Sequence, residues 1–339
     1  MDRDFSSALF KEMRLGWNLG NTLDCPFGEI GWGNPLTSCE MILKIKELGF
    51  HTVRIPVSWH QHMDDDFNIS PEFMDRVATI TEWVLDQGMY AILNIHHDNH
   101  EFQPTVEGAE RGKKYISSVW GQIAKRFESA PDRLIFEGMN EPRMLKDKNE
   151  WHLDMMDERC RKAAEYINVF NQVFVDAVRN CGGKNKNRVL MVPSYAAGPA
   201  HAFMPEFKVP YDPSDRLIVS IHVYDPQGLA LLPDPDKTEF NDNGKKVLDY
   251  ILDNAYSKFV ERGVPVIIGE MGIVDKQNPL DRYRWCRYFV SHALKRKILL
   301  VWWDNGGRDF RLLDRRNLSV YKEAEPVMKG LLEGLEGLE

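Results

Sequence analysis

Eight short apolar runs recur along the chain, and none of them alternates strictly between apolar and polar positions. A strand that is buried on both faces has this continuous apolar pattern, which is typical of parallel sheets. Consecutive runs begin 28 to 54 residues apart, which leaves room for a helical crossover between each pair. The runs cover residues 14–20, 51–57, 89–95, 134–140, 188–194, 216–224, 264–270 and 298–304.

The segments between these runs have the spacing of amphipathic helices. In the first segment, Met41, Ile42, Ile45 and Leu48 share one helical face. The segment 195–216 is rich in Pro and Gly, so we expect only a short or broken helix there. Alternating strands and helices with no linker between them predict an α/β protein, a single (β/α)8 TIM barrel over residues 1–339. The predicted helices cover residues 38–48, 71–85, 113–127, 158–179, 245–261, 281–296 and 321–335.

The amino-acid composition excludes some classes of binding partner for this protein. Hydrophobic residues are 43% of the 339 and charged residues 28%, as in an ordinary soluble globular protein. The net charge of −8 repels phosphate backbones, so we expect no nucleic acid partner. The longest apolar run, 298–303, is far below the ~20 residues that span a bilayer, so we expect no membrane partner. The five cysteines are scattered, which excludes a disulfide framework or zinc motif.

The first residues, MDRDFSSALFKEMR, carry charges where a signal peptide has an apolar segment. Two interpretations remain open on this pattern. Either the protein is intracellular, or the chain begins after a leader was removed.

Polar and aromatic side chains stand at the same end of nearly every predicted strand. In a (β/α)8 barrel the loops that follow the strands gather at one end, and the functional site lies there. We therefore examine these residues for chemistry. They are Asn18, Asn21, Arg54, Trp59, His96, His97, Asp98, Asn140, Glu141, His222, Tyr224, Glu270, Trp302, Trp303, Asp304 and Asn305.

Two of these residues, Glu141 and Glu270, follow apolar runs from different parts of the chain and can converge across the barrel mouth. Two convergent carboxyl groups are the minimum for glycoside hydrolysis, in which one protonates the leaving oxygen and the other attacks or activates water. Like charges close together raise one pKa, which supplies the acid form at neutral pH. Arg54 would keep the second carboxylate ionised and oriented. The competing interpretation is that each Glu caps a helix or pairs with a surface Lys.

Two other classes of function remain as alternatives. A metal-dependent hydrolase would use His96, His97 and His100, but such sites need His and Asp from several strands. Because His96 and His97 are adjacent, we expect their side chains to diverge. A non-catalytic sugar-binding barrel would keep the tryptophans and lose at least one carboxylate, whereas this chain has both.

Several motifs in chain order carry a family resemblance. LIFEGMNEPR (134–143) is similar to the Asn-Glu-Pro signature of retaining glycoside hydrolases of clan A. The remaining motifs are GWNLGNTLD (16–24), WGNP (32–35), VRIPVSW (53–59), NIHHD (94–98), HVY (222–224), IIGEMG (267–272) and WWDNG (302–306). Together they resemble glycoside hydrolase family 5, and within it the bacterial endo-β-1,4-glucanases and xyloglucanases. The resemblance runs from about residue 14 to about residue 325.

The resemblance implies roles for the residues that match the family's motifs. Glu141 matches the acid/base, and Glu270 matches the nucleophile that forms a covalent glycosyl-enzyme. Asn140 matches the residue that hydrogen-bonds the sugar 2-hydroxyl. Arg54 matches the arginine that orients the nucleophile and keeps it charged.

Further matches surround the two carboxylates. Tyr224 matches the tyrosine near the nucleophile, and His222 the histidine near the acid/base. His96 and His97 match the pair that contacts or supports the sugar in the −1 subsite. Trp303 matches the aromatic platform under that sugar, and an indole ring stacks well on the apolar face of glucose.

Other candidates follow from position alone. Trp302 should point away from the site, because adjacent strand residues alternate in direction. Asn21, Trp32 and Trp59 follow the first two runs and are candidates for substrate binding, the two tryptophans in outer subsites. Tyr195, after the fifth run, is a similar candidate.

The resemblance implies an endo-acting β-1,4-glucanase, with activity extending to mixed-linkage glucan and xyloglucan, that uses no metal or organic cofactor. It also implies a β-glucan partner, a monomer, and a secreted protein whose leader is absent from this chain. A retaining β-mannanase of the same family is the alternative, because the same two glutamates serve both reactions. Met271 and Val223 replace aromatic residues that many relatives carry, which leaves the choice of polysaccharide open.

Overall fold

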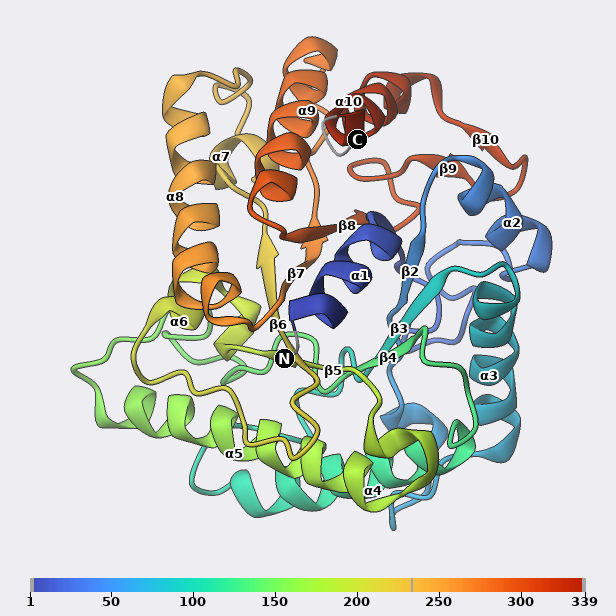
Figure 1. The fold of residues 1–339 in the computed structure, drawn as a ribbon, viewed down its shortest axis with the longest axis vertical. Helices are drawn as coiled ribbons and strands as arrows, with labels where there is room; N and C mark the ends of the chain where they lie inside the picture. The colour runs from blue at the N-terminus through green and yellow to red at the C-terminus, as the bar shows by residue number, and fades with distance from the viewer. Residues whose placement is uncertain (1–2, 233, 337–339) are drawn as a thin grey trace.

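The eight predicted runs form a closed barrel of parallel strands in the computed structural model, which describes residues 3–232 and 234–336 (Figure 1). Each strand pairs with the next along the chain, and β8 pairs with β1 to close the ring. Every strand residue of the barrel is buried except Trp303, which explains why the runs do not alternate. The strands are β1 (Leu15–Leu19), β2 (Thr52–Ile55), β3 (Tyr90–Asn94), β4 (Leu134–Glu137), β5 (Leu190–Pro193), β6 (Leu217–Val223), β7 (Val266–Met271) and β8 (Leu299–Asp304).

Helices surround the barrel, one or more after most strands (Figure 1). The prediction of a short helix in the fifth unit is confirmed, because α6 has only 5 residues. The apolar pattern does not predict α1 or α7. The helices are α1 (Arg3–Met13), α2 (Cys39–Glu47), α3 (Pro71–Asp86), α4 (Ala109–Arg126), α5 (Glu158–Asn180), α6 (Pro199–Phe203), α7 (Gln227–Ala230), α8 (Asp242–Lys258), α9 (Pro279–Lys295) and α10 (Glu325–Leu335). Shorter elements are the 3-10 helices η1 (His60–His62), η2 (Gly183–Lys186), η3 (Tyr195–Ala197), η4 (Val260–Arg262) and η5 (Lys322–Ala324), and the strands β9 (Leu313–Asp314) and β10 (Ser319–Val320).

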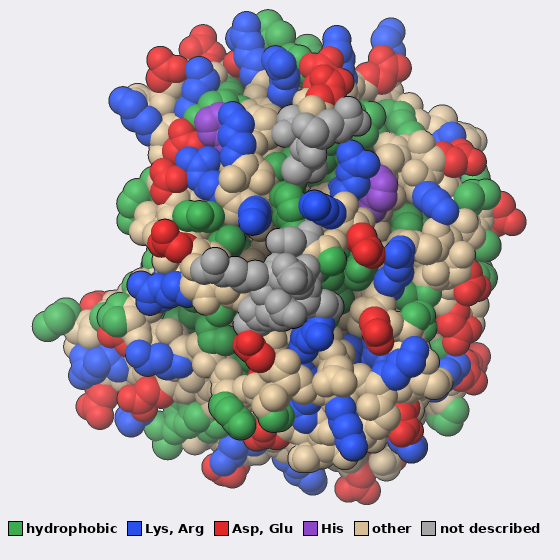
Figure 2. All heavy atoms as spheres, in the orientation of Figure 1, with side chains coloured by type: hydrophobic (Ala, Val, Ile, Leu, Met, Phe, Trp, Pro, Cys, Tyr) green, Lys and Arg blue, Asp and Glu red, His purple; other side chains and the backbone are tan. Residues whose placement is uncertain are grey.

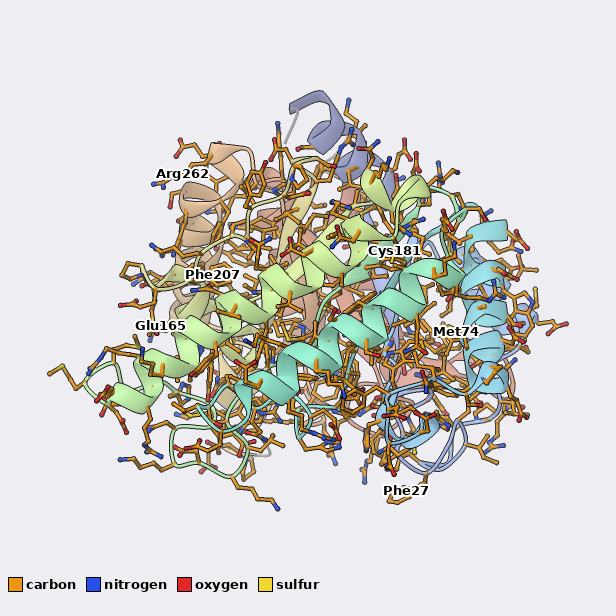
Figure 3. The ribbon with its side chains drawn as sticks, turned by 90° about the horizontal axis from the view of Figure 1, so that it is seen from below. Phe27, Met74, Glu165, Cys181, Phe207 and Arg262 are labelled. Atoms are coloured by element: carbon orange, nitrogen blue, oxygen red, sulfur yellow. The ribbon has the colours of Figure 1, made fainter. Side chains whose placement is uncertain are left out.

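The two ends of the barrel differ. Helix α1 covers the end at which the strands begin: Leu9, Phe10 and Met13 are buried in the core, and the Thr52 hydroxyl donates to the Met13 carbonyl at 3.0 Å. Figure 3 shows α1 at one end of the molecule and Phe27, in the β1–α2 loop, at the other. The strands therefore end on the side away from α1, and the predicted site lies there.

The register of β7 changes at Gly269. Ile268 pairs with Ile221 on β6, but Glu270 pairs with His222, so β7 contains one extra residue. The same irregularity appears on the β8 side of the strand. A bulge of this kind redirects the side chain that follows it, here Glu270. The Gly269 carbonyl accepts a hydrogen bond from the Asn18 amide at 2.9 Å.

A two-stranded hairpin, β9–β10, ties the ends of β1 and β8 together. Arg315, in its turn, donates to the main-chain oxygens of Gly20 at 3.0 Å and Asp304 at 2.6 Å. Its guanidinium lies over the ring of Trp17 on β1, 5.0 Å from the centroid. The hairpin thus braces the segment that carries Trp303.

Charged side chains of both signs are interspersed on the face seen in Figure 2. Among the described residues, no helix has both the length and the apolar character needed to cross a membrane.

Candidate active site

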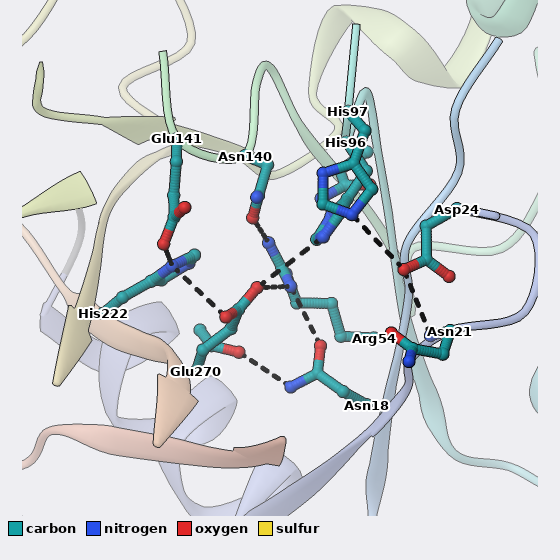
Figure 4. Close-up of polar contacts among 12 residues, drawn as sticks. Asn18, Asn21, Asp24, Arg54, His96, His97, Asn140, Glu141, His222 and Glu270 are labelled. Atoms are coloured by element: carbon teal, nitrogen blue, oxygen red, sulfur yellow. Dashed lines mark hydrogen bonds and ion pairs between the residues drawn. The ribbon is translucent and has the colours of Figure 1, made fainter. Parts of the chain in front are cut away.

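Glu270, at the end of β7, accepts a hydrogen bond on each carboxylate oxygen. Arg54 Nη1 donates to Oε1 at 2.8 Å (Figure 4). The Tyr224 hydroxyl donates to Oε2 at 2.9 Å. Burial and the charge of Glu270 raise the pKa of Tyr224 well above its usual value, so this hydroxyl keeps its proton. Two fixed donors orient the carboxylate.

Arg54 extends from β2 into the centre of the barrel and is fully buried. Its Nε donates to Glu137 at 2.7 Å, and Nη1 also donates to Asn18 at 2.9 Å. Nη2 donates to the Asn140 side-chain oxygen at 2.6 Å, which leaves the Asn140 amide nitrogen to donate to a substrate hydroxyl. Burial lowers the pKa of Arg54, but the charges of Glu137 and Glu270 outweigh it and raise the pKa, so the guanidinium stays charged.

Glu141 stands across the mouth from Glu270, with His222 between them (Figure 4). His222 Nδ1 lies 2.9 Å from Glu141 Oε1 and 3.6 Å from Glu270 Oε2. One oxygen of Glu141, one oxygen of Glu270 and one His222 nitrogen all lie within 4.8 Å of one another. Retaining glycosidases place their carboxyl groups about 5–5.5 Å apart and inverting ones about 6.5–9.5 Å, so this site has the closer spacing.

The hydrogen bond between His222 and Glu141 shifts the pKa of both groups. Burial lowers the pKa of His222, but the charge of Glu270 and the hydrogen bond to Glu141 outweigh it and raise the pKa. Burial raises the pKa of Glu141, but the hydrogen bond from His222, the charge of His222 and then that of Arg143 outweigh it and lower the pKa. Both shifts favour the charged forms, a protonated His222 beside an ionised Glu141, so the expectation that like charges raise the pKa of the acid group is not met at Glu141.

His96 and His97 lie beside Glu270, and the expectation that their side chains diverge is wrong. Their ring centroids are 4.4 Å apart, at an interplanar angle of 78°. His97 Nε2 is 3.7 Å from Asp24, whose pKa burial raises to about 6. Asn21 lies on the same side of the mouth, and its backbone N–H donates to Asp24 Oδ2 at 3.1 Å.

Two groups of described residues bring three metal-ligating atoms within 4.8 Å of one another, namely Asp24, His96 and His97, and Glu141, His222 and Glu270. In the first group the Asn94 amide nitrogen donates to His96 Nδ1 at 3.1 Å. Because the backbone N–H of Val57 fixes the Asn94 oxygen, this orientation places the His96 proton on Nε2. Neither nitrogen of His96 then offers a free lone pair to a metal.

Trp303 lies half-buried at the mouth, with its ring parallel to that of His96 and the centroids 5.7 Å apart. A Cβ at Gly20 would come within 2.9 Å of the Trp303 ring, so the glycine makes room for it. The prediction that Trp302 points away is confirmed: it is buried in the core and donates to the Phe310 carbonyl at 2.9 Å. Trp32 is 41% exposed and packs edge-on against His97, so it borders the site.

The prediction that Trp59 binds substrate in an outer subsite is wrong. Its side chain is 0% exposed, packs edge-on against Phe73 and donates to the Asn94 carbonyl at 2.9 Å, so it offers no face to a sugar. The similar prediction for Tyr195 is also wrong. Tyr195 is buried, and its hydroxyl accepts from the Met144 N–H at 3.1 Å. Both rings are core residues because later helices pack against them: Phe73 on α3 contacts Trp59, and His201 on α6 contacts Tyr195.

Three residues of the site were not singled out from the sequence. Glu137 and Asn94 are buried in β4 and β3, and Asn94 donates to Glu137 at 3.0 Å. Ser220, on β6, donates to the other Glu137 oxygen at 2.7 Å. A polar residue inside a fully apolar run is the signal that could have found them, because a buried carboxylate needs partners from other strands.

A family model described as "Cellulase (glycosyl hydrolase family 5)" matches residues 14–309. The chain belongs to glycoside hydrolase family 5. The resemblance that the motifs carry is thereby confirmed, and the barrel with two carboxylates at its mouth is the scaffold of this family member.

Among curated relatives, the chain is 41% identical over 343 residues to Cellulase/esterase CelE of Acetivibrio thermocellus, which covers 98% of this chain but 41% of that protein. It is 37% identical to Endoglucanase B of Neocallimastix patriciarum, covering 97% of this chain and 72% of the relative. The chain therefore spans less than half the length of the first of these relatives.

Solved structures of family members are also similar. A lichenase from a Caldicellulosiruptor species in complex with cellotetraose has a TM-score of 0.93 and 39% identity, covering 97% of this chain and 95% of that one. A broad-specificity endoglucanase from Ruminococcus champanellensis with bound cellotriose has a TM-score of 0.89 and 37% identity, covering 96% and 97%.

Proposed function

We propose that this family 5 member is an endo-acting β-1,4-glucanase that cleaves cellulose-like β-glucans with retention of configuration. The observation that carries the proposal is the pairing of Glu141 and Glu270, whose carboxylate oxygens come within 4.8 Å at the barrel mouth. Their surroundings differ. Glu270 is held by Arg54 and Tyr224, whereas Glu141 is hydrogen-bonded to His222.

In the first step, Glu270 attacks the anomeric carbon while Glu141 protonates the departing glycosidic oxygen. The bond between Glu270 and the sugar forms as the bond to the leaving chain breaks. Asn140 presents its amide nitrogen to the substrate, and a hydrogen bond to the sugar 2-hydroxyl would strengthen in the transition state. Trp303 offers the face on which this sugar stacks.

In the second step, Glu141 acts as a base. It takes a proton from water, the water oxygen attacks the anomeric carbon, and Glu270 leaves as a carboxylate. Arg54 and Tyr224 stabilise the charge that returns to Glu270. The residues described supply each proton transfer of this cycle, and no step requires a metal or an organic cofactor.

The choice of a β-glucan rests on the relatives. The lichenase and the broad-specificity endoglucanase have cellotetraose and cellotriose in their structures, and both cover nearly the whole of this chain. Because the broad-specificity enzyme is so similar, we propose that mixed-linkage glucan and xyloglucan are also substrates.

A substrate panel tests this proposal. Hydrolysis rates are measured on carboxymethyl-cellulose, mixed-linkage β-glucan, xyloglucan and mannan, and product lengths are followed from the first minutes. We expect internal cleavage of the glucans, with a rapid fall in viscosity and a ladder of products. Dominant activity on mannan would overturn the assignment, and release of a single short product would overturn the endo mode.

The stereochemical outcome needs its own measurement. Proton NMR of freshly cleaved cello-oligosaccharide reports the anomer that forms before mutarotation. We expect the β-anomer first, because two inversions at the same carbon restore the configuration. An initial α-anomer would refute the two-step mechanism.

We also propose that the protein is a monomer that acts outside the cell, since polymeric glucan does not cross a membrane. Light scattering at micromolar concentration tests the first point, and a dimer mass would contradict it. Fractionation of the native source with an antibody to this chain tests the second, and confinement to the cytosol would contradict it.

A further inference from the structure

Arg143 directly follows the Asn140–Pro142 segment and faces Glu141, the proposed acid/base, from the β4–α5 loop. Its Nη1 lies 3.6 Å from Glu141 Oε2 and donates to the Glu141 main-chain oxygen at 2.9 Å. Arg143 and Glu141 have side chains that are 15% and 19% exposed, so water screens their interaction only in part. Asn99 also donates to the Glu141 main-chain oxygen at 2.9 Å, which fixes the backbone at this point.

Two neighbours hold the Arg143 guanidinium in place. Trp151 lies under it, with the guanidinium carbon 4.1 Å from the ring centroid. Glu150 accepts from Arg143 Nε at 3.1 Å, and its other oxygen accepts from the Lys146 N–H at 2.9 Å. Arg143 is thus clamped between an aromatic face and a carboxylate, instead of closing onto Glu141.

We propose that Arg143 is a positioning residue that sets the upper pH limit of the reaction by opposing the protonated form of Glu141, and that Glu150 offsets part of this effect. The proposal rests on the assignment of Glu141 as the acid/base. Nothing in the two-step mechanism itself calls on Arg143 or Glu150.

The groups around Glu141 come from several elements. His222 at the end of β6 binds Oε1, while Glu270 on β7 and Tyr224 after β6 lie beyond that histidine. His97, from the β3–α4 loop, contributes a further interaction, and burial lowers its pKa, which keeps it largely neutral.

Arg143 is the charged group that lies next to Glu141 Oε2. In the contacts of the described residues, Arg143 does not pair with Glu270. Arg54, by contrast, pairs with Glu270. Arg143 is therefore the charge that can be changed without altering the nucleophile.

The charge of Arg143 affects the two steps of the reaction in opposite ways. A nearby cation stabilises a carboxylate and disfavours the carboxylic acid. Arg143 therefore favours the base form of Glu141 that the second step needs, at the expense of the acid form that the first step needs. Glu150 reduces the net positive charge near Glu141, which lessens the penalty on the acid form.

The first test is Arg143→Gln, with kcat/KM for a cello-oligosaccharide measured from pH 4 to 9. The pH dependence of kcat/KM reports the pKa values of the essential groups in the free enzyme. Removing the cation should move the alkaline limb upward by about one pH unit. With 2,4-dinitrophenyl cellobioside, whose leaving group needs no proton, the alkaline limb should be weak and should not move.

The second test is Glu150→Gln, which leaves Arg143 and Trp151 in place. Because a negative charge is removed, the alkaline limb should move in the opposite direction, to lower pH. Arg159→Gln is the matched control: it removes a guanidinium that anchors the same loop through Asp147 at 2.9 Å and that has no described contact with Glu141. Its profile should match the wild type.

Opposite shifts in the two variants support the proposal. Shifts in the same direction would show a disturbed loop and would overturn it, as would two unmoved limbs. Failure of the proposed function is recognised separately, because the unaltered protein would then cleave none of the glucans.

Discussion

At the scale of single residues, the site depends on one buried cation shared by two carboxylates. Arg54 bonds Glu137 on one side and Glu270 on the other, and all three side chains are withdrawn from water. Glu137 accepts two further hydrogen bonds, so its charge is fully compensated. A buried ion pair of this kind adds little stability by itself, but removing one partner leaves an uncompensated charge.

Replacing the cation should therefore destabilise the protein strongly. Arg54→Met is expected to lower the free energy of unfolding by about 3–5 kcal/mol, measured by urea denaturation. Adding Glu137→Gln removes one stranded charge and should recover part of the loss. A double variant as unstable as the single one would show that the loss of stability does not come from the unpaired charge of Glu137.

Glu270, the proposed nucleophile, can be replaced with little change of shape. Glu270→Gln keeps the volume and one acceptor for Arg54 or Tyr224, but an amide does not attack the anomeric carbon. We expect kcat to fall by a factor on the order of 10⁴ or more, while calorimetry still detects oligosaccharide binding. Glu110→Gln, on the exposed face of α4, is the control. Near-normal turnover in Glu270→Gln would mean that the nucleophile is another residue.

At the scale of elements, the short fifth unit supports the loop that carries Arg143. The Tyr195 hydroxyl donates to the Asn149 carbonyl at 3.1 Å, and the Ala196 N–H donates to the Pro142 carbonyl at 2.8 Å. His201, on α6, donates to the Tyr195 carbonyl and accepts from the Leu153 N–H. The Pro-rich segment thus replaces a long crossover helix with a support for the active-site loop.

His201 makes this support sensitive to acid. Burial lowers its pKa to about 4, from an ordinary value of 6.5. Because His201 binds a proton less well in the folded state than in the unfolded state, its protonation favours unfolding. Its effect on the free energy of unfolding is therefore absent above about pH 6.5, and the free energy falls as the pH drops from there toward 4. The loss is about 3 kcal/mol. His201→Gln should show a shallower fall in unfolding free energy over this range, and parallel curves would contradict the prediction.

Two helical glycines should respond oppositely to a methyl group. A Cβ at Gly330 on α10 would lie 2.5 Å from the Tyr283 carbonyl on α9, whereas at Gly121 on α4 nothing lies within 4 Å. Gly330→Ala should destabilise by about 1–3 kcal/mol, because the backbone cannot move away. Gly121→Ala should stabilise by about 0.5–1 kcal/mol. Thermal unfolding of both variants checks the pair, and equal shifts would be contrary to expectation.

At the scale of the whole molecule, stability and chemistry occupy opposite ends of the barrel. Helix α1 closes one end with Leu9, Phe10 and Met13, and the two carboxylates face the other. Closure of the ring through β8 and β1 joins the ends into one cooperative sheet. A change beneath α1 should therefore alter stability without altering the site.

Met13→Ala tests this separation. Truncating a buried methionine should cost about 2–5 kcal/mol of unfolding free energy. At 25 °C and with the protein still folded, kcat/KM on glucan should stay at the wild-type value. Lys11→Ala, at an exposed position of the same helix, is the control for helix propensity. A large drop in kcat/KM with retained folding would show that α1 is coupled to the active site.

Much of this architecture follows from local patterns. Continuous apolar runs are the direct consequence of strands buried on both faces, so the eight strands and most helices are recognisable from their order and spacing. The positions of Glu141 and Glu270 follow from the same pattern, because both stand where an apolar strand ends. Helix α1 escapes prediction because it contributes only a few buried residues and has no strand before it.

The contacts of individual side chains depend on segments that are distant in sequence. Trp59 has the position of a subsite residue, yet it is buried because Phe73 and the Asn94 carbonyl cover it. The bulge at Gly269 and the partners of Glu137 depend on how β7 and β4 meet their neighbours. By itself, then, the sequence determined the barrel, the family and the pair of carboxylates, because hydrophobic burial acts residue by residue along each strand. Only the tertiary structure decided which rings face the cleft and which charges meet Glu141 and Glu270, because packing and electrostatic interactions join residues far apart in the chain.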